Sequence, residues 1–168
     1  NITEARQVDS NSWYQKDMSA EGLAIYTEGA DAINVTVGEL MAFDAGGESS
    51  PENWKLGIVR WLRCPTEVGV EIGIQCLAEN AWAVASKKMK TDTIEERGQY
   101  VRTFIAPRVN LLEQPATLIA PAEAYRCNDV VMVNLPEEIV HVKLVDLIET
   151  TPQFDRFNIT MLHLVDKN

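Results

Sequence analysis

The sequence contains few of the residues that build disulfide frameworks and metal sites. It has 3 cysteines and 2 histidines among 168 residues. The cysteines are odd in number and lack close CxxC spacing, so neither a disulfide framework nor a zinc site is predicted. We therefore expect reduced thiols in a cytoplasmic protein without a metal.

Long apolar runs and a basic surface are also missing. No stretch approaches the roughly 20 apolar residues that span a bilayer, and there is no signal-peptide pattern. The chain begins with Asn, so we expect it to be cut from a longer protein. The formal net charge of -10 argues against DNA or RNA as a partner, because nucleic-acid binding needs basic surface that neutralises phosphates. Any anionic ligand must be held by a few local arginines.

Catalytic signatures are absent as well. The sequence has no GxSxG, GxxxxGK[ST] or GxGxxG motif. His141 and His163 alternate with apolar neighbours, as structural or surface histidines do. Glu95 and Glu96 lie in a polar segment, where a solvated pair is expected. We predict that the chain is not an enzyme and needs no cofactor.

Short strand patterns separated by turns run through the whole chain. Residues 68–77 show the clearest period of two, which predicts one buried face and one that is at least partly solvated. Helical spacing occurs only over residues 145–150, which allow one or two turns. The predicted fold class is all-β. The expected strands are 22–26, 33–37, 40–43, 54–63, 68–77, 81–86, 100–106, 116–120, 130–134, 140–148 and 157–164.

A polar and charged segment at residues 87–98 (KKMKTDTIEERG) interrupts the strand patterns. It is the expected linker between a β-barrel at residues 1–86 and a β-rich extension at residues 99–168. Whether the extension forms a separate barrel stays open at this point.

The stretch Asp17–Gly22 (DMSAEG) is the most informative in the chain. An acid, a hydroxyl and a glycine meet there at the mouth of an expected hairpin. The arrangement can grip a base edge, and Asp17 and Ser19 can equally serve only the turn by bonding its backbone.

The pattern D-x-S-x-x-G resembles the second signature of PilZ domains, β-barrels that bind the bacterial messenger cyclic di-GMP. The hairpin of Leu56–Trp61 (LGIVRW) and Val70–Gln75 (VEIGIQ) is similar to the closing strands of PilZ barrels. This resemblance covers residues 1–85. The second half looks like the C-terminal extension of a less common PilZ-like group.

The resemblance implies a PilZ-like antiparallel β-barrel followed by a second β-rich subdomain, in a regulatory receptor of the bacterial cytoplasm. Asp17 and Ser19 would hydrogen-bond a guanine edge, and Gly22 would let the backbone close on it. Arg6 would contact a phosphate or stack on the base. Arg60 would act as an anion contact, or as a structural residue at a strand end.

The first PilZ signature, RxxxR, is not present in the chain. Arg6 is the only arginine before Asp17, and Ile2 and Ser10 occupy the positions four residues away. Losing one charge-assisted contact costs about 1.5–3 kcal/mol, or roughly 10- to 100-fold in affinity. The alternative function is therefore a degenerate PilZ-like adaptor that binds a protein partner through its β-rich second half and not the nucleotide.

Overall fold

The described part of the chain is built entirely from β-strands. The structure is a computed structural model. It describes residues 13–19, 22–28, 35–44, 54–67, 69–89, 99–106 and 115–165. Every regular element in these ranges is a strand, so the predicted all-β class is confirmed. None of the described residues form a helix that could cross a membrane.

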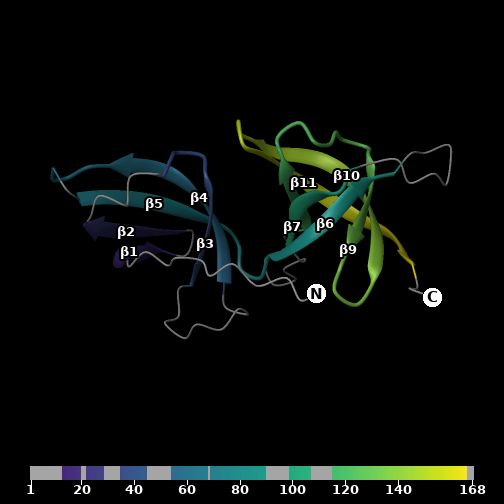
Figure 1. Cartoon of the computed structure of the whole chain (residues 1–168), viewed down its shortest axis with the longest axis horizontal. Helices are drawn as coiled ribbons and strands as arrows, with labels where there is room; N and C mark the ends of the chain where they lie inside the picture. Colours follow the sequence, from purple (N-terminus) through teal and green to yellow (C-terminus); the bar gives the residue numbers. More distant parts are fainter. Residues whose placement is uncertain are drawn as a thin grey trace. The chain divides into compact units, whose positions relative to one another are not determined.

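The described strands form two structural units, a five-stranded sheet and a closed barrel (Figure 1). The sheet has the strand order β1-β2-β5-β4-β3. Strand β2 pairs antiparallel with β1 on one side and with β5 on the other. Its strands are β1 (Tyr14–Ser19), β2 (Gly22–Glu28), β3 (Leu40–Asp44), β4 (Trp54–Arg63) and β5 (Gly69–Ala78).

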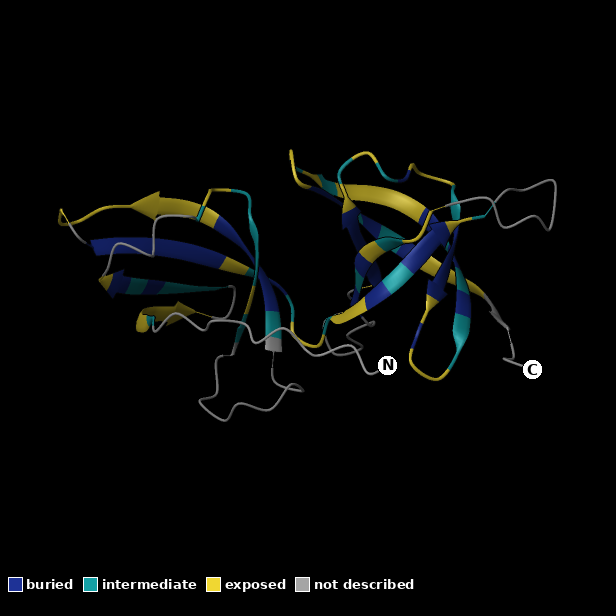
Figure 2. Ribbon diagram, viewed as in Figure 1, coloured by how far each residue is buried: buried dark blue, intermediate teal, exposed yellow. Residues whose placement is uncertain are grey.

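The central strand β5 is buried on both faces over most of its length (Figure 2). Ile72 and Ile74 belong to the apolar core of the sheet, as their alternation predicts. The prediction of a partly solvated second face is wrong for Glu71 and Gly73, which are also buried. Side chains from neighbouring strands lie across that face, and only Gln75 among these positions is exposed.

The second unit is a closed barrel with the strand order β10-β11-β8-β7-β6-β9. Antiparallel pairing of β9 with β10 closes the ring. Its interior is apolar, with Leu118, Val131, Val140 and Leu144 fully buried. The strands are β6 (Trp82–Lys88), β7 (Val101–Ala106), β8 (Thr117–Pro121), β9 (Val130–Asn134), β10 (Ile139–Thr150) and β11 (Phe154–Val165).

Strand β6 belongs to the barrel, although the sequence analysis grouped it with the first half. It pairs with β7 and β9 along residues 82–88. Val84 and Ser86 are buried there, because the barrel needs this strand to close. The strand pairing changes before Trp82, and the expected boundary between residues 86 and 87 stays a prediction. Residues 90–98 of the expected linker lie outside the described residues.

The helical turns expected over residues 145–150 are absent, because β10 continues as a strand to Thr150. Its pairing with β11 shifts register between Leu144 and Asp146, and again between Leu147 and Glu149. Each bulge adds a residue to one strand and interrupts the alternation of faces. Two bulges so close together produce the irregular apolar spacing that the sequence analysis took for a helix.

Two further differences concern the first unit. Strand β1 was missed, because its six residues are all exposed and show no buried face in the sequence. The strand expected at residues 33–37 is not observed over 35–37, where the chain enters a turn with Gly38 at φ 92. Residues 33 and 34 lie outside the described residues.

Truncating the barrel core at Phe157 should cost about 3–5 kcal/mol of unfolding free energy. Its side chain is only 1% exposed inside the barrel. Urea denaturation of Phe157→Ala measures the loss. Leu162→Ala on the same strand is the matched control, because Leu162 is 42% exposed and should lose less than about 1 kcal/mol. Equal losses in both variants would contradict the assigned core.

Candidate functional site

The D-x-S-x-x-G stretch spans the closed end of the β1–β2 hairpin. Asp17 and Ser19 lie at the end of β1, and Gly22 opens β2 directly opposite Ser19. A bulge between Gln15 and Asp17 shifts the register of the pair. The hairpin therefore holds the acid, the hydroxyl and the glycine at one end of the sheet.

Gly22 has a structural reason to be glycine. It pairs with Gln75 of β5, and a Cβ atom at this position would overlap the backbone carbonyl oxygen of Ile74. No side chain fits between the two strands here. The glycine thus permits the close approach of β2 to β5, whatever else it does.

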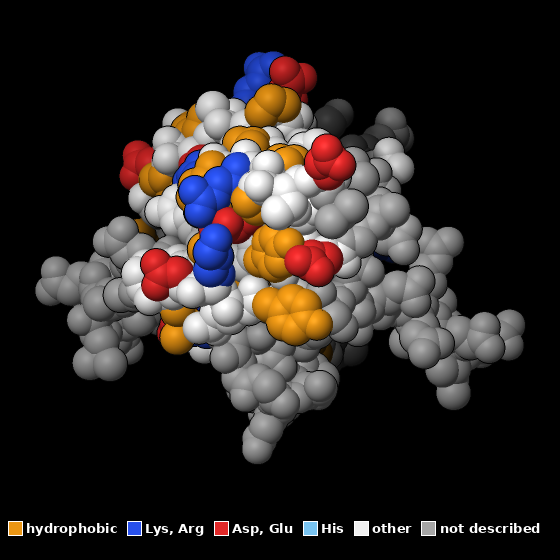
Figure 3. Space-filling view, turned by 90° about the vertical axis from the view of Figure 1, so that its left-hand side faces the viewer, with side chains coloured by type: hydrophobic (Ala, Val, Ile, Leu, Met, Phe, Trp, Pro, Cys, Tyr) orange, Lys and Arg blue, Asp and Glu red, His pale blue; other side chains and the backbone are white. Residues whose placement is uncertain are grey.

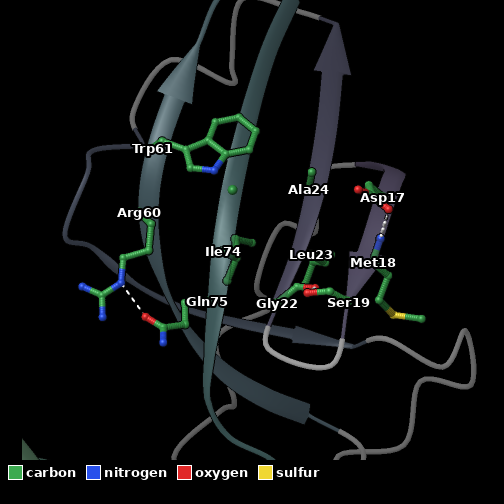
Figure 4. Close-up of a pocket in the computed structure, with 11 residues that line it drawn as sticks. Asp17, Met18, Ser19, Gly22, Leu23, Ala24, Arg60, Trp61, Ile74 and Gln75 are labelled. Atoms are coloured by element: carbon green, nitrogen blue, oxygen red, sulfur yellow. Dashed lines mark hydrogen bonds between the residues drawn. The ribbon is translucent and has the colours of Figure 1, made fainter.

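A pocket of about 320 Å³ crosses four adjacent strands of the sheet (Figure 4). Asp17 and Ser19 stand on one side of it, and Arg60 and Trp61 of β4 on the other. Strands β2 and β5 run between these two sides. Its lining residues are Asp17, Met18, Ser19, Gly22, Leu23, Ala24, Arg60, Trp61, Gly73, Ile74 and Gln75.

The structure brings together the predicted site residues that it describes. Asp17, Ser19, Gly22 and Arg60 all line this one pocket, although Arg60 is far from the others in sequence. Arg6 lies outside the described residues. Their roles toward a ligand stay predictions.

Local hydrogen bonds hold the polar side chains of the pocket. The Asp17 carboxylate accepts a bond of 2.8 Å from the backbone N–H of Met18, and the Ser19 hydroxyl donates to the carbonyl of Gly22 at 3.3 Å. The Arg60 Nε donates to the Gln75 side chain at 2.7 Å. Asp17 and Ser19 therefore do make the turn contacts weighed in the sequence analysis. Both remain exposed, so these contacts leave their polar atoms accessible.

Trp61 and Gly73 form an aromatic wall that sequence reasoning missed. A Cβ at Gly73 would overlap the indole of Trp61, so the ring lies directly against the backbone of β5 (Figure 4). The indole is 40% exposed and lines the pocket. The signal in the sequence was a glycine inside a regular strand, which often marks close approach of another group.

Glu71 is a buried carboxylate with two cationic partners. Its side chain is 2% exposed, and it accepts from Arg63 and from Lys16, both at 2.7 Å. The hydrogen bond from Arg63 and then that from Lys16 lower the pKa of Glu71 below its ordinary value, against the effect of desolvation. We call these three residues the Glu71 cluster. Arg63 also lies 5.2 Å from the centre of the Trp61 ring.

Charged side chains of both signs lie on this face of the first unit. Figure 3 shows a group of lysine and arginine side chains with acidic and hydrophobic side chains around it. The described residues contain no group of three or more His, Cys, Asp or Glu side chains that could hold a metal ion.

Two domain families match the chain. "Cyclic-di-GMP receptor FimW, middle PilZ domain" matches residues 3–82, and "FimW C-terminal beta-barrel domain" matches residues 87–162. The protein named Cyclic-di-GMP receptor FimW from Pseudomonas aeruginosa (strain PAO1) is 27% identical over 85 residues. This match covers 51% of the chain and 14% of that relative, so the chain spans only a small part of it. No solved structure matches the chain with significance.

Proposed function

Since the chain consists of a PilZ domain of the FimW type followed by the FimW-type C-terminal β-barrel domain, we propose that it is the cyclic di-GMP-binding part of a regulatory, non-enzymatic receptor. The pocket at the β1–β2 hairpin is the ligand site in this proposal. The messenger is its ligand, and the bacterial cytoplasm is where it acts.

One observation carries this proposal. The D-x-S-x-x-G residues and Arg60, which are separated in sequence, line the same pocket. An exposed carboxylate can accept from the N–H groups of a guanine edge, and a neighbouring hydroxyl can donate to or accept from it. Arg60 places a guanidinium on the opposite side, where it can meet an anionic group. Arg6 is proposed as a further contact to a phosphate or a base.

The size and walls of the pocket support a base as the bound group. Its volume of about 320 Å³ lies at the lower end of the range for small-ligand sites. The exposed ring of Trp61 offers an apolar and aromatic surface beside the polar groups. We therefore assign one guanine of the messenger to the pocket and the rest of the molecule to its open rim.

The alternative of an adaptor that binds only protein is not favoured, because the family that matches the first half is that of a cyclic-di-GMP receptor. The receptor family is one of binding regulators, which agrees with the lack of catalytic motifs. A protein partner for the closed barrel stays a separate proposal.

Calorimetric titration of the full-length protein with cyclic di-GMP tests the proposed function. We expect saturable binding with protein at roughly tens of micromolar. Cyclic di-AMP is the matched control, because adenine lacks the N1–H and 2-amino groups of guanine from which Asp17 would accept. Absence of heat with cyclic di-GMP, or equal binding of both dinucleotides, would refute the proposal.

A further inference from the structure

The Glu71 cluster carries more positive than negative charge. Lys16 and Arg63 both pair with the one carboxylate, so two cations face one anion. The whole chain has a formal net charge of -10. A local cationic excess on such an acidic chain attracts anions to this place rather than to the surface in general.

The two cations come from β1 and β4, the strands on either side of the pocket, although neither side chain lines it. Lys16 lies on β1, directly before Asp17, at the bulge that shifts the register of this strand. Arg63 lies on β4 and stacks near Trp61, which lines the pocket. Glu71 stands between them on β5. One buried carboxylate thus joins β1 and β4 across the sheet, next to the pocket residues Asp17, Trp61 and Gly73.

The exposure of the three side chains differs sharply. Glu71 is 2% exposed, whereas Lys16 is 53% and Arg63 is 61% exposed. Each oxygen of the Glu71 carboxylate already accepts from a cationic partner, so its negative charge is paired inside the cluster. An ammonium has three donors and a guanidinium has five, and each spends one in these bonds. The cations therefore keep donors for a second anion from solvent.

Two further ionisable groups near the cluster, Tyr26 and Glu28, are engaged with each other. Tyr26 pairs in register with Glu71, and its hydroxyl donates to Glu28 at 2.7 Å. That bond raises the pKa of Tyr26, so the phenol stays neutral at ordinary pH. Glu28 is held at Tyr26 by this bond, and the ion pairs of the Glu71 cluster join only Lys16, Arg63 and Glu71.

We infer that Glu71 is a positioning residue of the nucleotide site, and that it holds Lys16 and Arg63 so that they contact a phosphate of the bound dinucleotide. This inference rests on the proposed function. It assigns to strands β1 and β4 a phosphate contact besides the one proposed for Arg6, in a sequence that lacks the second arginine of RxxxR. The cations are held in place before the ligand arrives, so less side-chain freedom is lost on binding.

Removing either cation tests the contact. We expect Arg63→Gln and Lys16→Gln to weaken cyclic di-GMP binding about 10- to 100-fold, the usual effect of losing a charge-assisted bond. Their affinities should also depend less on salt, because one screened attraction is gone. Lys55→Gln is the matched control, since Lys55 makes an ion pair of the same 2.7 Å length with Glu79. It should bind like the wild type.

Neutralising the carboxylate tests the positioning role. In Glu71→Gln both cations remain but lose their shared anchor, so affinity should fall while its salt dependence is kept. Glu79→Gln is the control, and circular dichroism melting confirms that each variant is folded. Tighter binding by Glu71→Gln would overturn the inference, because it would mean that Glu71 competes with the phosphate.

The outcomes separate this inference from the proposed function. If the wild type binds cyclic di-GMP and both cation variants bind equally well, the phosphate contact is refuted and the receptor function stands. If the wild type does not bind cyclic di-GMP, both are refuted. Weaker binding with unchanged salt dependence in both cation variants would also overturn the phosphate contact, since it would indicate a structural effect only.

Discussion

The Gly22→Ala variant should unfold at a clearly lower temperature than the wild type and should lose nucleotide binding with its fold. The added Cβ would overlap the Ile74 carbonyl, and backbone cannot rotate aside as a side chain can. Either β2 or β5 must shift, which breaks pairing in the middle of the sheet. Overpacking of this kind costs roughly 1–3 kcal/mol. Thermal melting by circular dichroism measures the loss.

The Gly38→Ala variant distinguishes the cost of steric overlap at Gly22 from the cost of an unfavourable backbone conformation. Gly38 has a φ of 92, but nothing lies within 4 Å of an added Cβ. Its substitution should cost only the strain of the left-handed conformation, about 1–2 kcal/mol. If Gly22→Ala melted like the wild type, the close approach of β2 and β5 would not require glycine.

The Asp17→Asn variant should keep the fold and lose most of its affinity for cyclic di-GMP. The amide oxygen can still accept from the Met18 N–H, so the hairpin contact survives. The charged acceptor for a guanine edge is gone, and an amide group that can donate takes the place of one oxygen. We expect binding to weaken about 10- to 100-fold, with a melting temperature within about 2 °C of the wild type.

Asp146→Asn is the matched control for this acid-to-amide change. Asp146 is an exposed strand residue of the barrel, in the other unit. Calorimetry should find its affinity unchanged. Retained binding by Asp17→Asn would mean that the Asp17 carboxylate does not contact the ligand. Equal loss of affinity in both variants would point to the overall charge of the protein.

Much of the fold could be predicted because strand periodicity and turn residues are local signals. Strand β4 has the predicted bounds, and β5 differs by one residue at each end. The exposed edge strand β1 could not be predicted, since nothing in it alternates. At the bulged end of β10 a helix was predicted where a strand is observed, because the inserted residues give the strand an apolar spacing like that of a helix.

The site was predictable only where a short motif marks it. Asp17, Ser19 and Gly22 are adjacent in sequence, so their pattern is legible without a structure. Burial of Glu71 depends on side chains reaching across from β1 and β4, which strand alternation does not reveal. Trp61 against Gly73 is likewise a contact between two strands.

The closed ring of the second unit has a consequence for the order of folding. Its first strand, β6, pairs on one edge with β7, the next strand in sequence. Its other edge pairs with β9, which begins only at Val130. Closure further needs β9 to meet β10. Contacts of such long sequence separation form slowly, because the intervening chain must first lose its freedom. Strand β6 therefore emerges from the ribosome well before β9 and keeps one edge unpaired until β9 has been made.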